Sequence, residues 1–346
     1  MSRSGLWMWW IAAVAAASSG AVWGKGETVT VVVDEGTNIA ATLSPDKAQL
    51  IIDLQGVLWG LPIEGGTAIR LTDDFLEPAR PAWSPKGDRV VFEAYAGGTF
   101  HIWSMNPDGT DLTRLTDGHY DDREPRFSPD GRRIAFSSDR GLASDGTRSY
   151  DVWVLDLDTG ALSQITSSPA EEFEPAWSPD GSQLAFVNGN GNGNTIDVID
   201  ASGERRTVAT AEPNARLNSP SWSPDGSTLA YIHFQNNRSQ LWISGKQIAP
   251  FNDVFPFPAE WLSENEVLYT ADGKIRRTNI DTGETGEIPF QAELFLNRQS
   301  YARRSVDFDS TRPRPAKGIV GPALSPDGRR IVFEALNELW LMEIGG

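Results

Sequence analysis

Acidic side chains recur in three segments of the sequence, and each segment carries three or more carboxylates. Carboxylates that converge can hold a hard cation such as Ca²⁺, which accepts several oxygen ligands in flexible geometry, or a basic segment of another protein. We therefore interpret these residues as a candidate mouth that binds a basic protein or peptide, with Ca²⁺ as the metal candidate. The alternative interpretation is a set of solvated loops. The candidate residues are Asp73, Asp74, Asp117, Asp121, Asp122, Glu124, Glu171, Glu172 and Glu174.

The histidine and serine patterns do not indicate a catalytic centre. The three histidines, His101, His119 and His233, are too far apart in the sequence to form a His-x-His metal pair. The sequence has no Gly-x-Ser-x-Gly nucleophile elbow and no cysteine, which excludes a thiolate metal site and a disulfide framework. We predict no catalytic residue and no cofactor apart from the Ca²⁺ candidate, and we interpret His101 and His233 as packing residues.

A long connection, residues 291–317, is basic within an otherwise acidic chain. An irregular loop longer than about 15 residues in a compact fold is usually functional or disordered. We expect this segment either to cover the acidic mouth as a lid or to dock a partner. Its basic residues are Arg298, Arg303, Arg304, Arg312, Arg314 and Lys317.

A repeated phrase defines the elements that must position these residues. It reads Pro-x-aromatic-Ser-Pro-Asp-Gly, followed by two polar residues and an apolar-small-aromatic triplet. Good copies occupy 81–92, 125–136, 175–186, 220–231 and 322–333, and weaker copies occupy 41–52 and 258–269. In the tight turn, Pro fixes φ, Asp caps the backbone and Gly takes positive φ. The turn residues in four good copies are Asp130, Gly131, Asp180, Gly181, Asp225, Gly226, Asp327 and Gly328. Lys47 in one weak copy and Ser263–Glu266 in the other predict turns that are built differently.

The spacing of the copies predicts an all-β protein. Copies recur at about 40–50 residues, which is the length of a four-stranded propeller blade. We predict a seven-bladed β-propeller of four-stranded antiparallel blades, with six blades as the alternative. The segment 28–33 is expected to complete the last blade by pairing with 339–344, because this pairing would remove two exposed sheet edges. The acidic segments then fall in loops between successive blades, which share one face of the ring.

The repeat resembles that of the TolB-type propellers, and the resemblance covers nearly all of the chain after the N-terminus. Finer similarity exists to the N-terminal propeller of large exported amidohydrolases. It lies in residues 34–38, 43–46, 58–63, 288–290 and 318–325. The resemblance implies a non-catalytic module that binds protein or peptide. The alternative that it implies is the propeller half of an amidohydrolase-like system whose catalytic domain is absent from this chain.

The N-terminus and the composition indicate an exported protein. Arg3 precedes an apolar stretch and then small residues, which is the layout of a signal peptide over residues 1–24. Residues 25–346 are expected to form a single propeller domain without a membrane span, monomeric and periplasmic or secreted. The formal net charge is −17, which excludes nucleic acid as a favoured partner and favours a basic protein surface.

Overall fold

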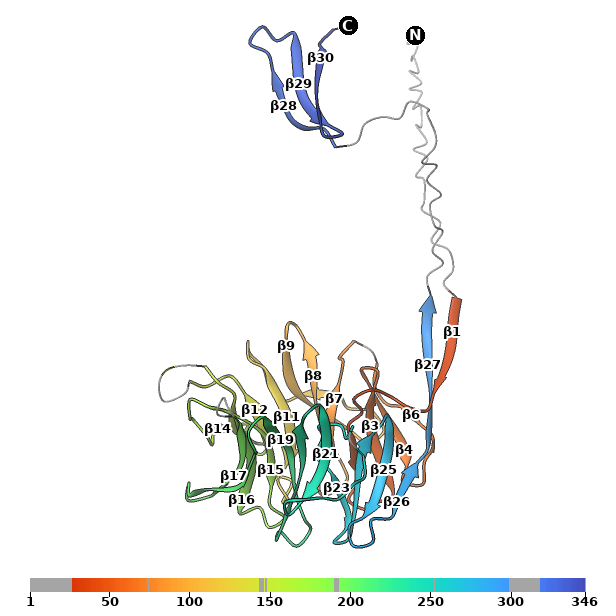
Figure 1. The fold of residues 1–346 in the computed structure, drawn as a ribbon, viewed down its shortest axis with the longest axis vertical. Helices are drawn as coiled ribbons and strands as arrows, with labels where there is room; N and C mark the ends of the chain where they lie inside the picture. Colours follow the sequence, from red (N-terminus) through yellow and green to blue (C-terminus); the bar gives the residue numbers. More distant parts are fainter. Residues whose placement is uncertain are drawn as a thin grey trace, which may run out of the picture. The chain divides into compact units, whose positions relative to one another are not determined.

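The computed structural model describes residues 27–298 and 318–345, except 74, 143–145, 147, 190–192 and 252. Strands are the regular elements of this part of the chain, which contains no helix (Figure 1). The predicted signal peptide lies outside the described residues, and so does most of the predicted basic connection, residues 299–317. The all-β class predicted from the sequence is confirmed.

The first three blades are four-stranded antiparallel sheets, each formed by consecutive strands of the repeat. The first blade contains β2 (Ala41–Leu43), β3 (Gln49–Leu54), β4 (Val57–Pro62) and β6 (Ile69–Arg70). The second contains β7 (Ala79–Trp83), β8 (Val90–Ala96), β9 (Thr99–Met105) and β10 (Thr113–Arg114). The third contains β11 (Asp122–Phe127), β12 (Arg133–Ser138), β13 (Asp151–Asp156) and β14 (Leu162–Gln164).

The next three blades repeat this order. The fourth contains β15 (Glu171–Trp177), β16 (Gln183–Gly189), β17 (Asn194–Asp200) and β18 (Arg205–Thr210). The fifth contains β19 (Ala215–Trp222), β20 (Leu229–Gln235), β21 (Arg238–Ile243) and β22 (Lys246–Gln247). The sixth contains β23 (Glu260–Ser263), β24 (Glu266–Ala271), β25 (Lys274–Asn279) and β26 (Thr285–Ile288).

Apolar faces of neighbouring blades pack on each other. Phe92, Phe136 and Phe186, the aromatic residues that end the repeat triplet, are fully buried in three successive interfaces. Burying a side chain of this size contributes about 1.5–3 kcal/mol. A single blade would leave these faces in water, so each blade depends on its two neighbours.

The ring closes between the first and sixth blades. One apolar cluster joins these two blades. It combines Ile39, which precedes β2, and Leu50 of β3 with Leu268 and Ile275 of the sixth blade. The Thr270 hydroxyl of β24 donates a hydrogen bond of 2.6 Å to the carbonyl of Ile39. These contacts close a ring of six described blades. Six blades is the alternative predicted from the sequence, and the predicted count of seven is not confirmed.

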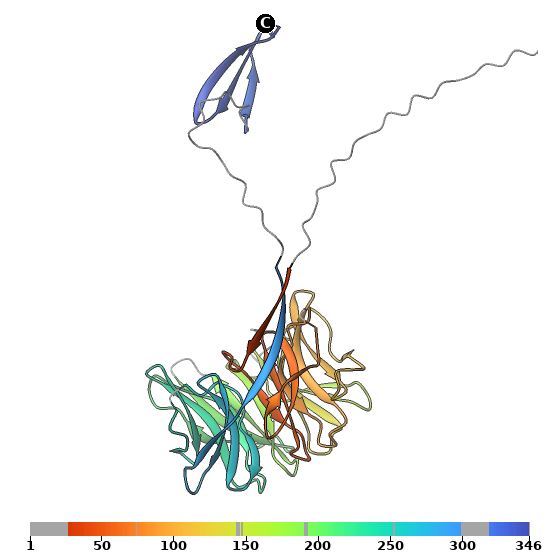
Figure 2. The same cartoon turned by 90° about the vertical axis from the view of Figure 1, so that its right-hand side faces the viewer.

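The predicted pairing of 28–33 with 339–344 is wrong. β1 (Glu27–Val33) lies beside β27 (Phe290–Arg298), which pairs in parallel with β5 (Gly66–Thr67) (Figures 1 and 2). The physical reason is that the first and sixth blades already bury each other's faces, so the ring needs no strand from the N-terminus. The first residues of the predicted irregular connection are also a strand, and Phe290 is buried in the closing cluster.

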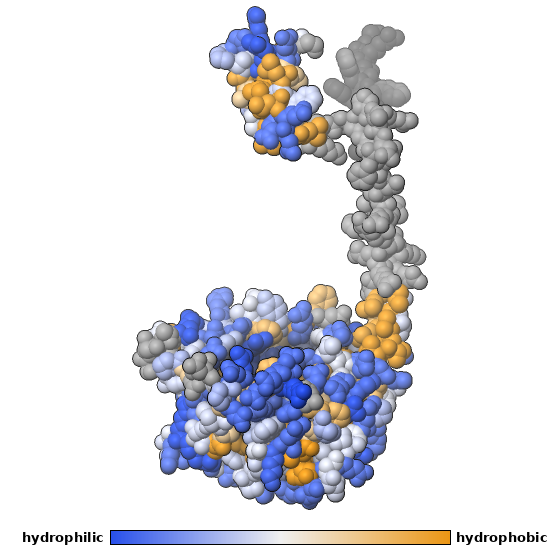
Figure 3. Space-filling model, viewed as in Figure 1, coloured by the Kyte–Doolittle hydropathy of each residue, from blue (hydrophilic) through white to orange (hydrophobic). Residues whose placement is uncertain are grey.

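β1 and β27 continue as a ribbon past the ring, with apolar side chains in solvent. Figure 3 shows the ring's surface on the side in view as mostly hydrophilic, with hydrophobic residues gathered on this ribbon. The exposed residues include Val32 and Phe295, at 56% and 52% of their full accessibility.

The seventh copy of the repeat forms a separate compact unit. β28 (Val320–Leu324), β29 (Arg330–Ala335) and β30 (Glu338–Glu343) make a three-stranded antiparallel sheet. The contacts among the described residues divide into two compact units. The single propeller domain that the sequence predicts for residues 25–346 stays a prediction.

The Ser-Pro-Asp-Gly turns share one geometry. In the third blade, the Ser128 hydroxyl donates to Asp130 Oδ1 at 2.6 Å, and the same oxygen accepts from the backbone N–H of Arg132. The turn glycines have φ of 69–71° at Gly131, Gly181, Gly226 and Gly328. Lys47 has φ 60° in a turn with the same contacts to Asp46, so the prediction of a different turn there is wrong. The geometry depends on the Ser and Asp side chains, which this copy retains. In the other weak copy, Ser263 pairs directly with Glu266.

Candidate functional site

A β-bulge in each of four inner strands shapes the channel at the centre of the ring. The residue before the repeat proline has positive φ in the second, third, fourth and fifth blades: Arg80 (52°), Glu124 (61°), Glu174 (54°) and Ser219 (54°). The pairing of the inner strand with its neighbour shifts register at each of these positions. A left-handed backbone at a non-glycine residue costs of order 1–3 kcal/mol and needs compensating contacts.

Carboxylates from the preceding blade supply that compensation. The N–H of Arg80 donates to Asp53 Oδ2 at 2.9 Å, and that of Glu124 donates to Glu93 Oε2 at 2.8 Å. The N–H of Glu174 donates to Glu124 Oε2 at 2.8 Å, and that of Ser219 donates to Glu174 Oε2 at 2.5 Å. Each bulge is thus tied to the blade before it, so the strained residues also hold the ring together.

Arg80 lies at the centre of these acidic groups. Its guanidinium donates to Glu174 Oε1 at 3.2 Å, and its nitrogens lie 3.9 Å from Glu124 and 4.0 Å from Glu93. We call Asp53, Arg80, Glu93, Glu124 and Glu174 the channel cluster. It has four carboxyl groups and one guanidinium. Arg123, with Nε 3.9 Å from Glu93, adds a second cation at its edge.

Burial controls the ionisation of the channel cluster. It raises the pKa of Asp53 to about 7 and also raises the pKa values of Glu93 and Glu174. Burial opposes the charge on Arg80, but Glu124, Glu174 and Glu93 together raise the pKa of its guanidinium. The cluster therefore keeps its cation and holds some of its carboxyl groups close to neutrality.

The predicted acidic residues separate into groups with different surroundings. Glu124 and Glu174 meet in the channel cluster, as described above. Asp73, Asp117 and Glu171 are exposed, and Asp121 is half-buried, where it accepts the N–H of Phe100 at 2.9 Å. We call these four the rim residues. Asp74 lies outside the described residues.

Asp122 and Glu172 are fully buried away from these groups. Arg140 and the Ser138 hydroxyl bind Asp122, and Arg205 binds Glu172. Their charges are neutralised within the protein, so they are unsuited to bind a partner. The described residues contain no group of three His, Asp or Glu side chains that could hold a metal ion.

Sequence reasoning missed Asp53, Arg80 and Glu93. It searched loops for runs of acidic residues, whereas these three occupy single positions inside strands. Arg80 stands before the repeat proline, and Asp53 and Glu93 each follow the last residue of the repeat triplet. Comparing the repeats position by position would have revealed them, because both positions lie next to landmarks of the motif.

A groove opens between the loops of the fourth and fifth blades. It has a volume of about 1290 Å³, and its lining includes Phe173, Phe234, Pro213 and Asn218. Glu171 of the rim lies at the same groove. Phe173 and Phe234 give this groove apolar contact area, and Glu171 and Arg216 give it one charge of each sign. Such a lining suits a peptide that carries both apolar and charged side chains.

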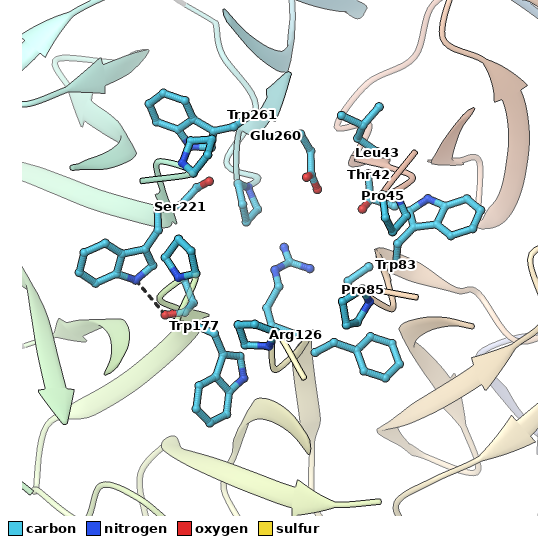
Figure 4. Close-up of a pocket in the computed structure, with 18 of the residues that line it drawn as sticks. Thr42, Leu43, Pro45, Trp83, Pro85, Arg126, Trp177, Ser221, Glu260 and Trp261 are labelled. Atoms are coloured by element: carbon cyan, nitrogen blue, oxygen red, sulfur yellow. Dashed lines mark hydrogen bonds between the residues drawn. The ribbon is translucent and has the colours of Figure 1, made fainter. Parts of the chain in front are cut away.

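A second cavity, of about 360 Å³, occupies the channel on the side of the Ser-Pro-Asp-Gly turns (Figure 4). All six described blades contribute to its wall. Trp83, Trp177, Trp222 and Trp261 of the repeat line it, together with the turn prolines, and Arg126 and Glu260 point into it.

The fold is shared with solved propellers of low sequence identity. The putative TolB from Agrobacterium tumefaciens matches with a TM-score of 0.51 and 16% identity, over 80% of this chain and 92% of that chain. The fold is that of a TolB-type β-propeller. An oligogalacturonate lyase, solved in complex with manganese, has a TM-score of 0.52 and 14% identity, over 92% and 96%.

A further TolB, from Acinetobacter baumannii, matches with a TM-score of 0.49 and 19% identity over 74% of this chain. The match spans 57% of that protein's own length. No protein-family profile matches the sequence, and no curated protein matches it.

Proposed function

We propose that this chain is an exported, non-catalytic β-propeller that binds a basic protein or peptide. The partner binds at the face of the ring that carries the rim residues, which we call the loop face. The observation that carries the proposal is the imbalance of charge at that end of the channel. The four rim residues place acidic groups at or near the surface there, and three of them are exposed. Below them, burial holds some carboxyl groups of the channel cluster close to neutrality, so the rim residues carry most of this field. A basic partner gains attraction from this field both as it approaches and once it is bound.

Exposed aromatic side chains, one in a loop and two near the ends of β8 and β20, support a protein partner over a metal ion. Phe75 is 91% exposed, Tyr95 is 43% exposed and Phe234 is 39% exposed. Exposed aromatic groups commonly provide the main anchors of protein interfaces. We therefore propose a partner segment that combines Lys or Arg with apolar residues. Ca²⁺ remains a weaker proposal, since the described carboxylates form no cluster suited to a metal.

The surroundings of the histidines favour a binding role over catalysis. His101 is buried, and its Nε2 lies 2.9 Å from both Thr99 and Arg114. Burial lowers the pKa of His101 and that of His233, whose ring stacks on Trp242 at 4.4 Å. Both imidazoles are therefore packed as neutral groups, a poor arrangement for general acid catalysis at neutral pH.

Export is proposed from the signal-like sequence of residues 1–24. Within the described residues, no helix has the length and apolar character needed to span a membrane. We propose a periplasmic or secreted location and a monomeric state, which size-exclusion chromatography coupled to light scattering of the mature chain would test.

The decisive experiment neutralises only the rim. The rim variant carries Asp73→Asn, Asp117→Asn, Asp121→Asn and Glu171→Gln. Asp122 and Glu172 are left intact, because removing one partner of a buried ion pair costs about 3–5 kcal/mol and would disturb the fold. A control variant makes the same change in charge at exposed turns away from the loop face, with Asp158→Asn, Glu204→Gln, Glu264→Gln and Glu284→Gln.

We expect wild type and the control variant to capture the same basic proteins from an envelope extract, as quantified by mass spectrometry. The rim variant should lose them, and a Lys-rich peptide should compete with capture by the wild type. Equal capture by all three proteins, with no effect of the peptide, would contradict the proposal.

A further inference from the structure

One position of the repeat faces the channel in all six described blades. It is the residue just before the aromatic position of the motif. Four blades carry a small uncharged residue there, whereas the third and sixth blades carry Arg126 and Glu260. In a ring of six blades, the third and sixth stand opposite each other. The full set is Thr42, Ala82, Arg126, Ala176, Ser221 and Glu260, all of which line the cavity on the turn side.

Arg126 has almost no partner in the protein. Its single hydrogen bond among the described residues runs from Nη1 to the carbonyl of Pro125, at 3.1 Å. No carboxylate oxygen of the described residues lies within 4.0 Å of a guanidinium nitrogen of Arg126, so it forms no ion pair with them. Burial lowers the pKa of its guanidinium. Most of its N–H donors are thus directed at the cavity without an acceptor.

Glu260 presents the opposite charge across the cavity (Figure 4). Burial raises the pKa of Glu260, whereas Arg126, the Thr42 hydroxyl and the backbone of Leu43 lower it. Its carboxylate points into the cavity (Figure 4). The two charged groups do not form an ion pair with each other, so the space between them is available to a ligand.

The rest of the wall combines aromatic and proline side chains with hydroxyl groups, among them Thr42, Ser84 and Ser221. Tryptophans from the second, fourth, fifth and sixth blades surround the cavity, and the turn prolines narrow it. A volume of about 360 Å³ accommodates a small molecule but not a folded segment of a partner. Separated opposite charges in a cavity lined by tryptophans favour a small ligand that carries both charges itself and has an apolar part.

We propose that this cavity binds a small zwitterion of the α-amino acid type with an apolar side chain. The carboxylate pairs with Arg126, the ammonium group pairs with Glu260, and the apolar side chain packs on the tryptophans. A dianion is disfavoured by Glu260 and a simple cation by Arg126. This site goes beyond the proposed partner binding, because it lies on the turn side of the channel and shares no residue with the rim.

The probes are L-leucine and its two matched fragments. 4-Methylpentanoate lacks the ammonium group of leucine, and 3-methylbutylamine lacks its carboxylate. Titration calorimetry on the mature full chain measures affinity, and tryptophan fluorescence reports contact with the walls. The dipeptide Leu-Leu distinguishes a free amino acid from the ends of a short peptide. Tighter binding of the dipeptide than of leucine assigns the zwitterion to a peptide.

Three variants test the assignment. Arg126→Gln should weaken leucine binding roughly tenfold to a hundredfold, the effect of losing a charged hydrogen-bonded pair. Glu260→Gln should reduce the affinity for leucine to that for 4-methylpentanoate. Arg132→Gln, which removes an exposed arginine from the turn of the same blade, should leave binding unchanged. Thermal unfolding confirms that each variant is folded, and Arg126→Gln is expected to be no less stable than wild type.

Three results would overturn the proposal. The first is no saturable binding of leucine or Leu-Leu by wild type. The second is equal affinity of the Arg126 and Arg132 variants for leucine. The third is equal affinity of wild type for leucine and 4-methylpentanoate, which would exclude a role for Glu260. None of these results would affect capture of a basic partner at the rim, so the two proposals fail separately.

Discussion

The residue before each repeat proline links the local backbone to the chemistry of the channel. Arg80, Glu124 and Glu174 occupy this position with left-handed φ, and each donates its N–H to a carboxylate of the preceding blade. The seventh copy has Gly321 there, with φ 56°. Glycine adopts this backbone without strain, which indicates that Arg80, Glu124 and Glu174 serve the contacts of their side chains and not the turn itself.

Gly181→Val should lower the free energy of unfolding by about 1–3 kcal/mol. A β-branched residue is strained at φ 70°, and a Cβ at this position would lie 3.5 Å from Pro129 of the preceding blade. Denaturant titration measures the change. Gly181→Asn is the matched variant and should cost less, because asparagine tolerates the left-handed region. A neutral Gly181→Val would contradict the turn geometry.

Asp53 should make the protein less stable as the pH rises from about 4 to about 7. Its pKa is raised to about 7 in the folded state from 3.8, so the folded state binds more protons than the unfolded state across this range. The contribution is fully present below about pH 4 and is lost as the pH rises through 7. Melting temperatures of wild type and Asp53→Asn, compared at each pH, should shift in favour of the variant as the pH increases. A constant difference would refute the raised pKa.

The sequence analysis grouped Glu124 and Glu174 with residues whose surroundings in the structure differ from theirs. Asp122 and Glu172 stand only two positions earlier, yet they point into blade interfaces and meet arginines from other strands. Residues two apart in a regular strand share a face. Here a β-bulge shifts the register between Arg123 and Arg126, and another does so between Phe173 and Ala176, so the regular alternation is broken at Glu124 and Glu174. The arginine partners are remote in the sequence, so the pattern of acidic residues could not reveal them.

At the scale of elements, the repeat predicted the strands of the blades well but not how the ring closes. Local motifs specify strands and turns, because their signals lie within a few residues. Closure depends on which apolar faces meet, and Ile39, Leu268 and Phe290 are far apart in the chain. The prediction therefore assigned residues 28–33 to the wrong neighbour.

Thr270→Val should destabilise the ring by about 1–3 kcal/mol. The substitution keeps the shape of the side chain but removes the donor to the carbonyl of Ile39, which is buried at the contact between the sixth and first blades. Thr228→Val is the control, because the Thr228 hydroxyl bonds only to Ser244 at an exposed site of its own blade. Chemical denaturation compares the two variants. If the two substitutions lowered the free energy of unfolding equally, the contact between Thr270 and Ile39 would contribute no more to stability than an exposed hydrogen bond.

At the scale of the whole molecule, the described strands divide into a ring and a separate three-stranded sheet. The ring has its own closing interface and its own core clusters. The channel has two chemically different ends, one rich in carboxylates and one with a single pair of opposed charges. The formal net charge of the whole chain is −17, so its overall electrostatic field attracts cationic groups.

A chain that ends at Arg298 should retain the cooperative unfolding transition of the ring at an unchanged melting temperature. The six blades pack on one another without β28, β29 and β30, which belong to the other unit. Differential scanning calorimetry of the truncated and full chains tests this expectation. Loss of the transition on truncation would show that the seventh copy is an integral blade.

The central claim is that the loop face binds a basic partner, and site-specific crosslinking tests it most directly. A photoreactive amino acid replaces Phe234 in the groove, and the same group replaces Leu162 on β14 as the control, since both side chains are about equally exposed (39% and 40%). We predict adducts with basic proteins from position 234, fewer at high salt, and none from position 162. Adducts from position 162 alone, or adducts from 234 that salt does not change, would contradict the claim.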